Sequence, residues 1–337
     1  MWCVERDEMS GMKALVFDGF GDADVLRYQE IDEPVLGVGQ ALIRMKAIGL
    51  NFADIYRRRG NYHLVGEPPY ILGYEGAGVV AAIHAEGEDT RYKVGDSVAF
   101  ADSPHANAEY VAVPLERLIP LPDGISFETA AAVLLQGLTA QYLLRDSHPL
   151  VAGESVLVHA AAGGVGLYLT QLAKSGGAFV VGIVSTESKR QAVLDAGADV
   201  VLLSGSDWVA SGRAATLGRR GFDVVYDSVG ITLRDSLRAA RAGGHVVFYG
   251  MSGGDPDPVD PRLLMDESKS LTGGDLWNVL TSAEERIARS NALFAMIREG
   301  RLRVQVAKSF ALSDGAAAHR FLEGRQAIGK VLLIPDW

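Results

Sequence analysis

A glycine-rich stretch near the middle of the chain has the residue types and spacing of a phosphate-binding turn. The apolar run SVLVH (155–159) is followed by Ala160-Ala161-Ala162-Gly163-Gly164-Val165-Gly166 and then by VGLYLTQLAKS, which has helical spacing. In a strand–turn–helix, Gly163 lets the backbone approach a pyrophosphate, and Gly166 lets the helix pack closely on the strand. The N–H groups and the dipole of the first helical turn attract the anion. The stretch therefore predicts dinucleotide binding at residues 163–166; the alternative is a tight turn that binds nothing.

The residues after the next strand bear on the choice between NAD and NADP. An acid about 20 residues beyond the turn would bind the ribose 2′-OH of NAD, but FVVGIV (179–184) is followed by Ser185, Thr186, Glu187, Ser188, Lys189 and Arg190. Hydroxyl groups and two cations suit a 2′-phosphate. Glu187 argues against this, and Lys189 and Arg190 alternatively form a solvated pair at the start of a helix. The pattern favours NADPH over NADH as the cofactor.

Strands and helices alternate around the glycine turn. A helical stretch at 127–145 is followed by apolar runs of strand length at 155–159, 179–184, 199–203, 223–229 and 245–250. Such alternation indicates a doubly wound parallel sheet. We therefore predict a dinucleotide-binding domain over residues 136–272.

The first part of the chain has a different pattern. Short apolar or alternating runs are separated by Gly and Pro turns, as in KALVF, ALIRMKAIGL, GAGVVAAI, DSVAF and AEYVAV, which predicts a β-barrel-like domain. A helix is expected at 283–299. The last strand, KVLLI (330–334), has no following helix and is expected to return to the first domain. We therefore predict that residues 12–135 and 273–337 form this domain and that residues 1–11 are an N-terminal extension.

Length, composition and charge limit the function classes. A chain of 337 residues with 48% hydrophobic and 22% charged residues is expected to fold as two domains. The net charge of −10 disfavours a general nucleic-acid or anionic-membrane binder. Cys3 is the only cysteine, which excludes an intrachain disulfide framework and a Cys-rich zinc site. Without an apolar run of membrane length or a signal-peptide pattern, the chain is expected to be a cytoplasmic protein.

Further motifs resemble one known family. The segment NFADIYRRRGNY (51–62) resembles the signature N-F-x-D-x-Y-x-R-x-G-x-Y of the quinone oxidoreductase, or zeta-crystallin-like, branch of the medium-chain dehydrogenases. The segments Gly137-Leu138-Thr139-Ala140, 159–166 and Tyr226-Asp227-Ser228-Val229-Gly230 resemble its later motifs. The resemblance extends over the chain from Met12. It implies an α/β fold with a GroES-like β-barrel catalytic domain and a Rossmann domain, and it favours a homodimer joined through Rossmann strands.

The resemblance also implies roles for particular residues. It places Asn51 and Tyr56 near the nicotinamide, where Tyr56 could donate a hydrogen bond to the substrate oxygen and Asn51 could orient substrate or cofactor. Alternatively, Tyr56 lines the site without a chemical role, since a phenol with a pKa near 10 is a reluctant proton donor. Thr139 could reach the nicotinamide amide or bond to its own helix. Lys330 could approach the cofactor phosphates or be a surface lysine. Other candidate cofactor contacts are Ser228, Val229, Gly230, Tyr249, Gly250, Met251 and Ser252.

The expected metal ligands of zinc-dependent relatives are missing. A Cys and the His of a G-H-E motif hold zinc in those relatives, whereas Asn51 and Tyr74 stand at the matching positions here. The seven histidines are scattered and show no metal-ligand spacing. We therefore expect no metal, and structural roles for three nearby residues: Asp54 as a helix cap, Arg58 as an ion-pair partner and Glu75 as a brace.

These observations predict NADPH-dependent reduction of quinones without zinc. Conjugated acceptors delocalise the incoming electrons, so positioning and hydrogen bonding supply most of the catalysis. One alternative is the NADPH-dependent reduction of α,β-unsaturated aldehydes or ketones. Another is a non-catalytic NADPH-binding protein.

Overall fold

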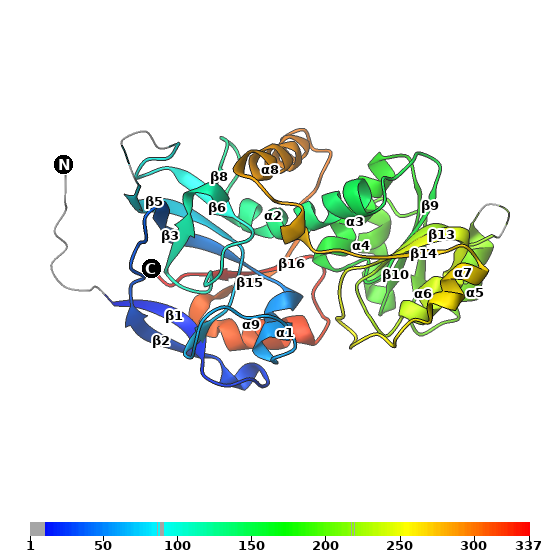
Figure 1. Ribbon diagram of the computed structural model, residues 1–337, viewed down its shortest axis with the longest axis horizontal. Coiled ribbons are helices and arrows are strands. Elements are labelled where there is room, and N and C mark those ends of the chain that lie inside the picture. The colour runs from blue at the N-terminus through cyan, green and yellow to red at the C-terminus, as the bar shows by residue number, and fades with distance from the viewer. Residues whose placement is uncertain (1–10, 86, 88–90, 217, 219) are drawn as a thin grey trace. The chain divides into compact units, whose positions relative to one another are not determined.

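The computed structural model describes residues 11–85, 87, 91–216, 218 and 220–337 and divides into two compact units (Figure 1). Unit 1 comprises Met1–Leu135, Ser282–Phe294 and Val306–Trp337, and unit 2 comprises Gln136–Thr281 and Ala295–Gln305. The segments 273–281 and 295–305, which the sequence assigns to the barrel domain, thus belong to unit 2. Except for Gly11, the predicted N-terminal extension lies outside the described residues.

Unit 1 contains two β-sheets. The larger has the order β15-β16-β3-β5-β6-β8, with β7 also paired to β3, and the smaller has the order β2-β1-β4. The strands of the larger sheet are β3 (Gln40–Leu50), β5 (Gly76–His84), β6 (Ser97–Phe100), β7 (Tyr110–Pro114), β8 (Ile119–Pro120), β15 (Val306–Ala311) and β16 (Lys330–Ile334). Those of the smaller are β1 (Gly11–Phe17), β2 (Arg27–Asp32) and β4 (Tyr70–Ile71).

The closing strand returns to the first part of the chain, as the sequence predicts. Strand β16 pairs antiparallel with β3, so that Val331 lies opposite Leu50, and it pairs parallel with β15. Apolar side chains of β1, β3 and β16, including Leu15, Ile43 and Leu333, form one buried core. The helices of unit 1 are α1 (Phe52–Arg58) and α9 (Gly315–Glu323), while α2 (Phe127–Tyr142) and α8 (Ala283–Arg298) each continue into unit 2.

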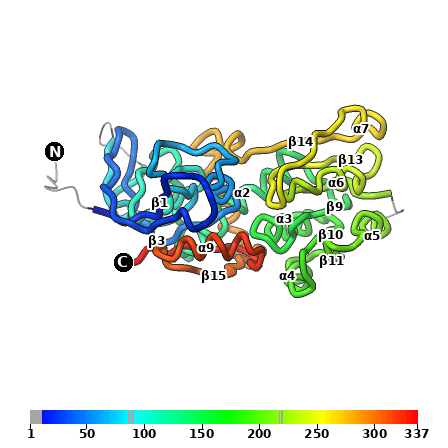
Figure 2. The backbone as a smooth tube through the Cα atoms, turned by 90° about the horizontal axis from the view of Figure 1, so that it is seen from below, coloured from blue at the N-terminus to red at the C-terminus, as the bar shows by residue number. Residues whose placement is uncertain are grey.

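Unit 2 is built on one parallel sheet with the order β11-β10-β9-β12-β13-β14. Its strands are β9 (Ser155–Val158), β10 (Phe179–Val184), β11 (Val200–Leu203), β12 (Phe222–Asp227), β13 (Ala240–Phe248) and β14 (Ser270–Gly273). Its helices are α3 (Gly164–Ser175), α4 (Arg190–Asp195), α5 (Trp208–Ala215), α6 (Leu233–Ala239) and α7 (Pro261–Asp266). Helix α3 packs on β9 and β10, and α6 packs on β12 and β13 (Figure 2). The predicted doubly wound sheet is confirmed.

The strand order reverses between β9 and β12. The chain runs outward from β9 to β11 and then returns to the other side of β9 as β12. In such sheets, ligands bind beyond the carboxyl ends of the strands at this reversal. The glycine turn follows β9 at this position.

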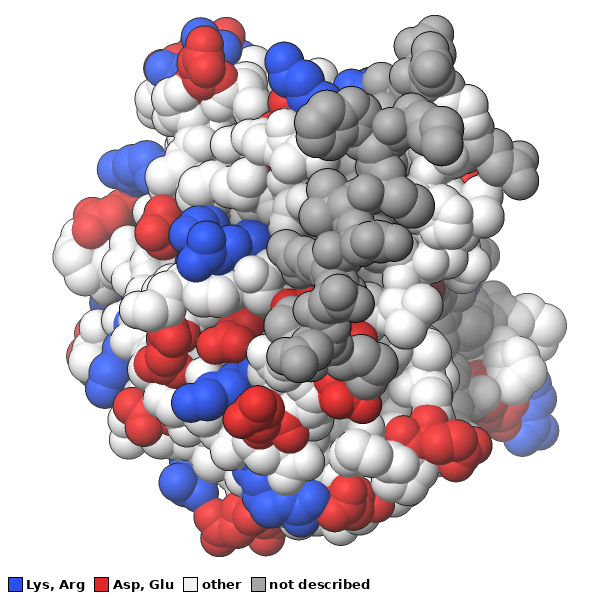
Figure 3. All heavy atoms as spheres, turned by 90° about the vertical axis from the view of Figure 1, so that its left-hand side faces the viewer, with Lys and Arg blue, Asp and Glu red and all other residues white. Residues whose placement is uncertain are grey.

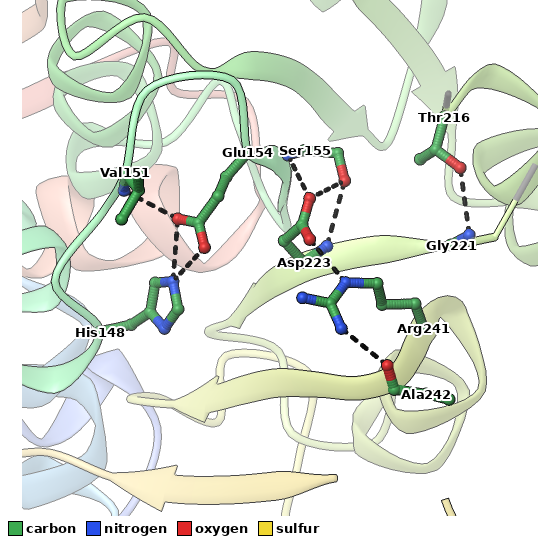
Figure 4. Close-up of polar contacts among 9 residues, drawn as sticks. All are labelled: His148, Val151, Glu154, Ser155, Thr216, Gly221, Asp223, Arg241 and Ala242. Atoms are coloured by element: carbon green, nitrogen blue, oxygen red, sulfur yellow. Dashed lines mark hydrogen bonds and ion pairs between the residues drawn. The ribbon is translucent and has the colours of Figure 1, made fainter. Parts of the chain in front are cut away.

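Polar contacts connect the strands of this sheet at their amino ends, away from the glycine turn (Figure 4). The carboxylate of Asp223 accepts hydrogen bonds from the N–H and hydroxyl of Ser155, both at 2.7 Å, and from Nε of Arg241 at 2.6 Å. The carboxylate of Glu154 contacts Nε2 of His148 at 3.0 Å and accepts from the N–H of Val151. These contacts tie together the starts of β9, β12 and β13.

The face of unit 1 seen in Figure 3 carries acidic and basic side chains side by side, without a continuous basic tract among the coloured residues. Within the described residues, no helix is long and apolar enough to cross a membrane.

Candidate active site

The glycine turn has the geometry of an anion-binding helix start. Helix α3 begins at Gly164, and the N–H of Gly163 donates to the carbonyl of Ala160 at 2.8 Å. Ala160 has a φ of 47°, which closes the turn in the left-handed region. The N–H groups of the first helical turn have no acceptor inside the helix, and Gly163, Gly164 and Val165 are half-buried. These residues fit a bound pyrophosphate.

Gly164 and Gly166 each lie so close to neighbouring atoms that a side chain would meet them. A Cβ at Gly166 would lie 2.4 Å from the carbonyl oxygen of Ala160 and 2.7 Å from Cα of Ala161, so only glycine lets α3 lie against the strand end. A Cβ at Gly164 would instead lie 1.8 Å from Oε1 of Gln136 on α2. Gln136 is a neighbour of the turn that the sequence pattern did not reveal.

Two further loops with predicted cofactor residues lie at the carboxyl ends of the strands, and backbone hydrogen bonds join them to each other. The N–H of Tyr249 donates to the carbonyl of Asp227 at 2.9 Å, and the N–H of Ser252 donates to the carbonyl of Ser228 at 3.0 Å. A Cβ at Gly250 would lie 3.2 Å from the Ser228 carbonyl oxygen. The candidates at 228–230 and 249–252, which include Val229, Gly230 and Met251, therefore form one backbone framework after β12 and β13.

The residues predicted to bind the 2′-phosphate follow strand β10. Ser185 and Thr186 are exposed, and Lys189 and Arg190 are half-buried. The guanidinium of Arg190 is paired with the Glu187 carboxylate at 2.5 Å and also donates to the carbonyl of Val201. Its hydrogen bond to Glu187 raises the pKa of Arg190 and lowers the pKa of Glu187. A 2′-phosphate would therefore compete with Glu187 for this guanidinium.

In unit 1, Asn51 and Tyr56 are placed by helix α1. Asn51 is the N-cap residue of α1, and its N–H donates to the Asp54 carboxylate at 2.9 Å, so Asp54 acts at the helix start as the N3 partner of a capping box. Asp54 is fully buried and burial raises its pKa, while Arg57 lies 3.6 Å away and opposes the shift. The half-buried ring of Tyr56 contacts two aromatic rings, with centroid distances of 6.3 Å to Phe52 and 6.4 Å to Tyr62.

A buried polar cluster lies beside the start of α1. The ammonium of Lys330 forms an ion pair with the Glu75 carboxylate, and both side chains are fully buried. Asn51 joins the two: its Oδ1 accepts from Lys330 Nζ at 2.9 Å, and its Nδ2 donates to Glu75 at 3.0 Å and to the Gly49 carbonyl at 3.2 Å. The other carboxylate oxygen of Glu75 accepts from the N–H of Leu135 at 2.7 Å. Glu75 therefore braces β16, β3 and α2, and the alternative of Lys330 as a surface lysine is wrong.

The residues of this cluster do not fit a zinc ion. Asn51 and Tyr74 present an amide and a phenol, and burial raises the pKa of the Tyr74 phenol, which disfavours a phenolate ligand. The Lys330 ammonium, bonded to Asn51, adds a positive charge that would repel a dication. Over the described part of the chain, no group of three or more His, Cys, Asp or Glu residues is arranged to hold a metal.

Arg58 and Thr139, two other residues that the sequence analysis singled out, are both buried. Arg58 is fully buried, forms an ion pair with Glu323 at 2.6 Å and donates to Nδ1 of His319 at 3.1 Å, so its expected role in the fold is confirmed. Thr139 is 9% exposed on α2. Sequence reasoning missed the contacts of His159 and Asp227 with Ser236, because Ser236 belongs to no motif and is brought to them only by the packing of α6.

Two family models match the chain. The model of the alcohol dehydrogenase GroES-like domain matches residues 37–170, and the model of the zinc-binding dehydrogenase matches residues 164–288. With the β-sheets of unit 1 and the parallel sheet of unit 2, they define an oxidoreductase of the medium-chain dehydrogenase class.

Individual relatives narrow the class. A quinone oxidoreductase of Pseudomonas aeruginosa is 39% identical over 326 residues, covering 96% of this chain and 99% of its own. A 2-haloacrylate reductase of a Burkholderia species is 37% identical over 334 residues, covering 96% and 99%. The crystal structure of the Escherichia coli quinone oxidoreductase complexed with NADPH superposes with a TM-score of 0.91 at 36% identity, covering 96% of this chain and all of that one. The chain belongs to the quinone oxidoreductase family.

Proposed function

We propose that this chain catalyses the NADPH-dependent reduction of quinones without zinc. The observation that carries the proposal is the buried cluster of Asn51, Glu75 and Lys330 at the start of α1, the helix that carries Tyr56. The Asn51 amide stands where zinc-dependent relatives are expected to have a metal ligand, and the Lys330 ammonium is bonded to it. The names of the quinone oxidoreductase relatives support the substrate class, and the NADPH complex of the Escherichia coli enzyme supports the cofactor.

The site suits an acceptor that needs no Lewis acid. When bound, NADPH supplies the hydride, and a conjugated quinone spreads the arriving charge over its ring and oxygens. A hydrogen-bond donor is then sufficient to stabilise the developing charge. Tyr56 is the proposed donor, and the neighbouring rings of Phe52 and Tyr62 offer apolar surfaces to a planar substrate.

Asn51 acts in this proposal by holding Lys330 and Glu75 in place. Both hydrogens of its amide nitrogen have acceptors in unit 1, the carboxylate of Glu75 and the carbonyl of Gly49. Its oxygen accepts from the Lys330 ammonium. The amide therefore fixes the start of α1, which carries Tyr56, and the Tyr56 hydroxyl is the group proposed to donate to the substrate oxygen.

The proposed cofactor contacts lie in unit 2. The pyrophosphate is assigned to the N–H groups of 163–166, and the 2′-phosphate to Ser185, Thr186, Lys189 and Arg190. The loops at 228–230 and 249–252, together with Thr139, are assigned to the nicotinamide half. Lys330, held by Glu75 and Asn51, acts as a fixed charge and not as a mobile phosphate ligand.

A second candidate is the reduction of α,β-unsaturated carbonyl compounds. The Burkholderia relative named 2-haloacrylate reductase favours it, because that name describes an acceptor with a conjugated double bond. The same hydrogen-bond donor would serve both substrates. A non-catalytic NADPH-binding protein is the third possibility.

Steady-state oxidation of NADPH with a panel of quinones and a panel of enals separates these functions. Turnover of quinones with higher kcat/KM than enals supports the proposal, the reverse order supports the second candidate, and binding without turnover supports the third. Tyr56→Phe should lower kcat with quinones by about tenfold, as expected for the loss of one hydrogen bond to a charged oxygen. Tyr70→Phe is the matched control, since the Tyr70 ring stacks on Phe20 elsewhere in unit 1.

Metal analysis tests the zinc-free part of the proposal separately. The purified protein should contain no stoichiometric zinc, and a chelator should leave NADPH oxidation unchanged. One tightly bound zinc per chain, with activity lost on its removal, would overturn this part.

We also propose a cytoplasmic homodimer joined through the sheet of unit 2. Among the strands that the structure describes, β14 is the last of that sheet and its partner is β13, so its outer side is the proposed contact with a second copy. Light scattering on a size-exclusion column tests the oligomeric state. Leu271→Pro on β14 should shift a dimer towards monomer, because proline removes a backbone donor.

A further inference from the structure

Three polar side chains from different elements of unit 2 meet in its interior. His159 follows β9, Asp227 ends β12 and Ser236 lies on α6, and their exposures are 2%, 0% and 0%. The Ser236 hydroxyl donates to Oδ2 of Asp227 at 2.6 Å and contacts Nε2 of His159 at 2.9 Å. Buried polar groups in such a chain are costly unless each is satisfied, so the arrangement constrains all three elements.

The chemistry of the three groups fixes the direction of the hydrogen bonds. Asp227 accepts from two backbone N–H groups and a threonine hydroxyl as well as from Ser236, so it acts as a carboxylate. The Ser236 proton points to Asp227, and His159 therefore donates its Nε2–H to the Ser236 oxygen. Burial lowers the pKa of His159, which favours its neutral form, while the charge of Asp227 opposes the shift. The edge of Trp208 meets its ring at a centroid distance of 4.9 Å.

The Asp227 carboxylate shapes the loop that follows β12. Its Oδ1 accepts from the N–H of Val229 at 2.8 Å and from that of Gly230 at 3.1 Å, and the hydroxyl of Thr232 donates at 2.8 Å to Oδ2. Gly230 has a φ of +88°, and a Cβ there would lie 2.1 Å from the Gly254 carbonyl oxygen. The carboxylate therefore holds a turn whose conformation glycine permits but does not enforce.

His159 connects this loop to the glycine turn. It directly precedes Ala160, which has a positive φ, and its N–H donates to the carbonyl of Tyr226 at 3.1 Å. The chain from His159 through Ser236 to Asp227 thus spans the strand-order reversal between β9 and β12. It joins the two loops on either side of the position where parallel sheets bind dinucleotides.

We propose that His159, Ser236 and Asp227 are positioning residues that keep the glycine turn and the 228–230 loop in register for NADPH. The inference rests on the proposed function, because it assigns the cofactor to these loops. None of the three side chains needs to touch the cofactor. Their effect is to hold backbone N–H groups in the bound conformation before binding.

Calorimetric titration with NADPH and hydrogen exchange test this role. Ser236→Ala should weaken NADPH binding by about tenfold, the loss expected for one hydrogen bond to a carboxylate. It should also speed hydrogen exchange at the N–H groups of Val229 and Gly230 without cofactor. Thr170→Val is the matched control: Thr170 is a fully buried hydroxyl on α3, and its loss should leave both readouts unchanged.

A conservative pair at His159 separates positioning from general core damage. His159→Gln retains an N–H donor near the Nε2 position and should keep NADPH affinity close to wild type, whereas His159→Leu should lose about tenfold. If Ser236→Ala does not fold, this pair decides. Equal affinities for the Gln and Leu variants, or an equal loss in Thr170→Val, would overturn the inference. A wild-type protein that binds no NADPH would instead refute the proposed function, while hydrogen exchange would still report on the loop.

Discussion

The ammonium of Lys330 is buried against the carboxylate of Glu75, although the two residues lie far apart in the chain. Neither side chain reaches solvent, and Asn51 bonds to both. Removing one partner of such a pair leaves an uncompensated charge in the interior. The start of α1, and with it Tyr56, therefore depends on a strand at the other end of the sequence.

Breaking this pair should destabilise the protein strongly. Lys330→Met or Glu75→Gln should each lower the free energy of unfolding by about 3 to 5 kcal/mol, measured by urea denaturation. Lys174→Met is the control, because the Lys174–Asp199 pair is partly exposed, with side chains 42% and 28% accessible, and should cost less than about 1 kcal/mol. A loss at Lys330 as small as that at Lys174 would contradict the structural role of the pair.

His319 should make the stability of unit 1 sensitive to acid. Burial, with the adjacent Arg58 charge, lowers the pKa of His319 to about 3 from its ordinary value of 6.5. Between these values the unfolded chain binds a proton that the folded chain does not, so stability is complete above pH 6.5 and falls as the pH drops towards 3. At pH 5 the loss should be about 2 kcal/mol.

The variant His319→Asn tests this dependence. The Oδ1 of asparagine takes the place of Nδ1 and can still accept the hydrogen bond from Arg58, but the amide does not titrate. Urea unfolding at pH 7.5 and pH 5.0 should show a smaller loss of stability in the variant than in wild type, by about 2 kcal/mol. Equal losses in the two proteins would show that His319 does not contribute.

Much of unit 2 could be predicted from the sequence because its signals are local. The apolar runs and the glycine turn each involve neighbours within a few residues, and all appear in the structure. The capping contact of Asp54 in unit 1 is local in the same way. The contacts of Lys330 and Ser236 could not be predicted, since they arise only when the sheet and α6 are packed. Strands β2 and β15 were also missed, because neither contains a buried residue or an apolar run.

Gly164 and Gly166 should respond differently to substitution. Gly164→Asp adds a carboxylate to the first turn of α3, and its Cβ meets the flexible amide of Gln136, which can move. NADPH affinity should fall by about tenfold while the melting temperature stays near wild type. Gly166→Ala places a Cβ against the backbone of Ala160 and Ala161 and should cost about 1 to 3 kcal/mol of stability. Calorimetry and thermal unfolding on both variants check the distinction, and unchanged NADPH affinity in folded Gly164→Asp would remove the phosphate from this turn.

The choice of NADPH over NADH should depend on a competition for Arg190. Glu187 holds its guanidinium in the absence of cofactor, so a 2′-phosphate must displace or share this contact. Replacing both Lys189 and Arg190 with Ala should weaken NADPH by about tenfold or more, since charge-assisted hydrogen bonds to the phosphate are lost, and should barely affect NADH. Glu187→Gln should have the opposite effect and strengthen NADPH relative to NADH, because it releases the guanidinium and removes a negative charge that would repel the phosphate.

The measurement is a set of titrations with both cofactors against wild type and the two variants at fixed salt, since screening alone alters a phosphate affinity. Equal changes for NADPH and NADH in the double variant, or a wild type that prefers NADH, would show that these cations do not bind a 2′-phosphate and would leave Ser185 facing an unphosphorylated ribose.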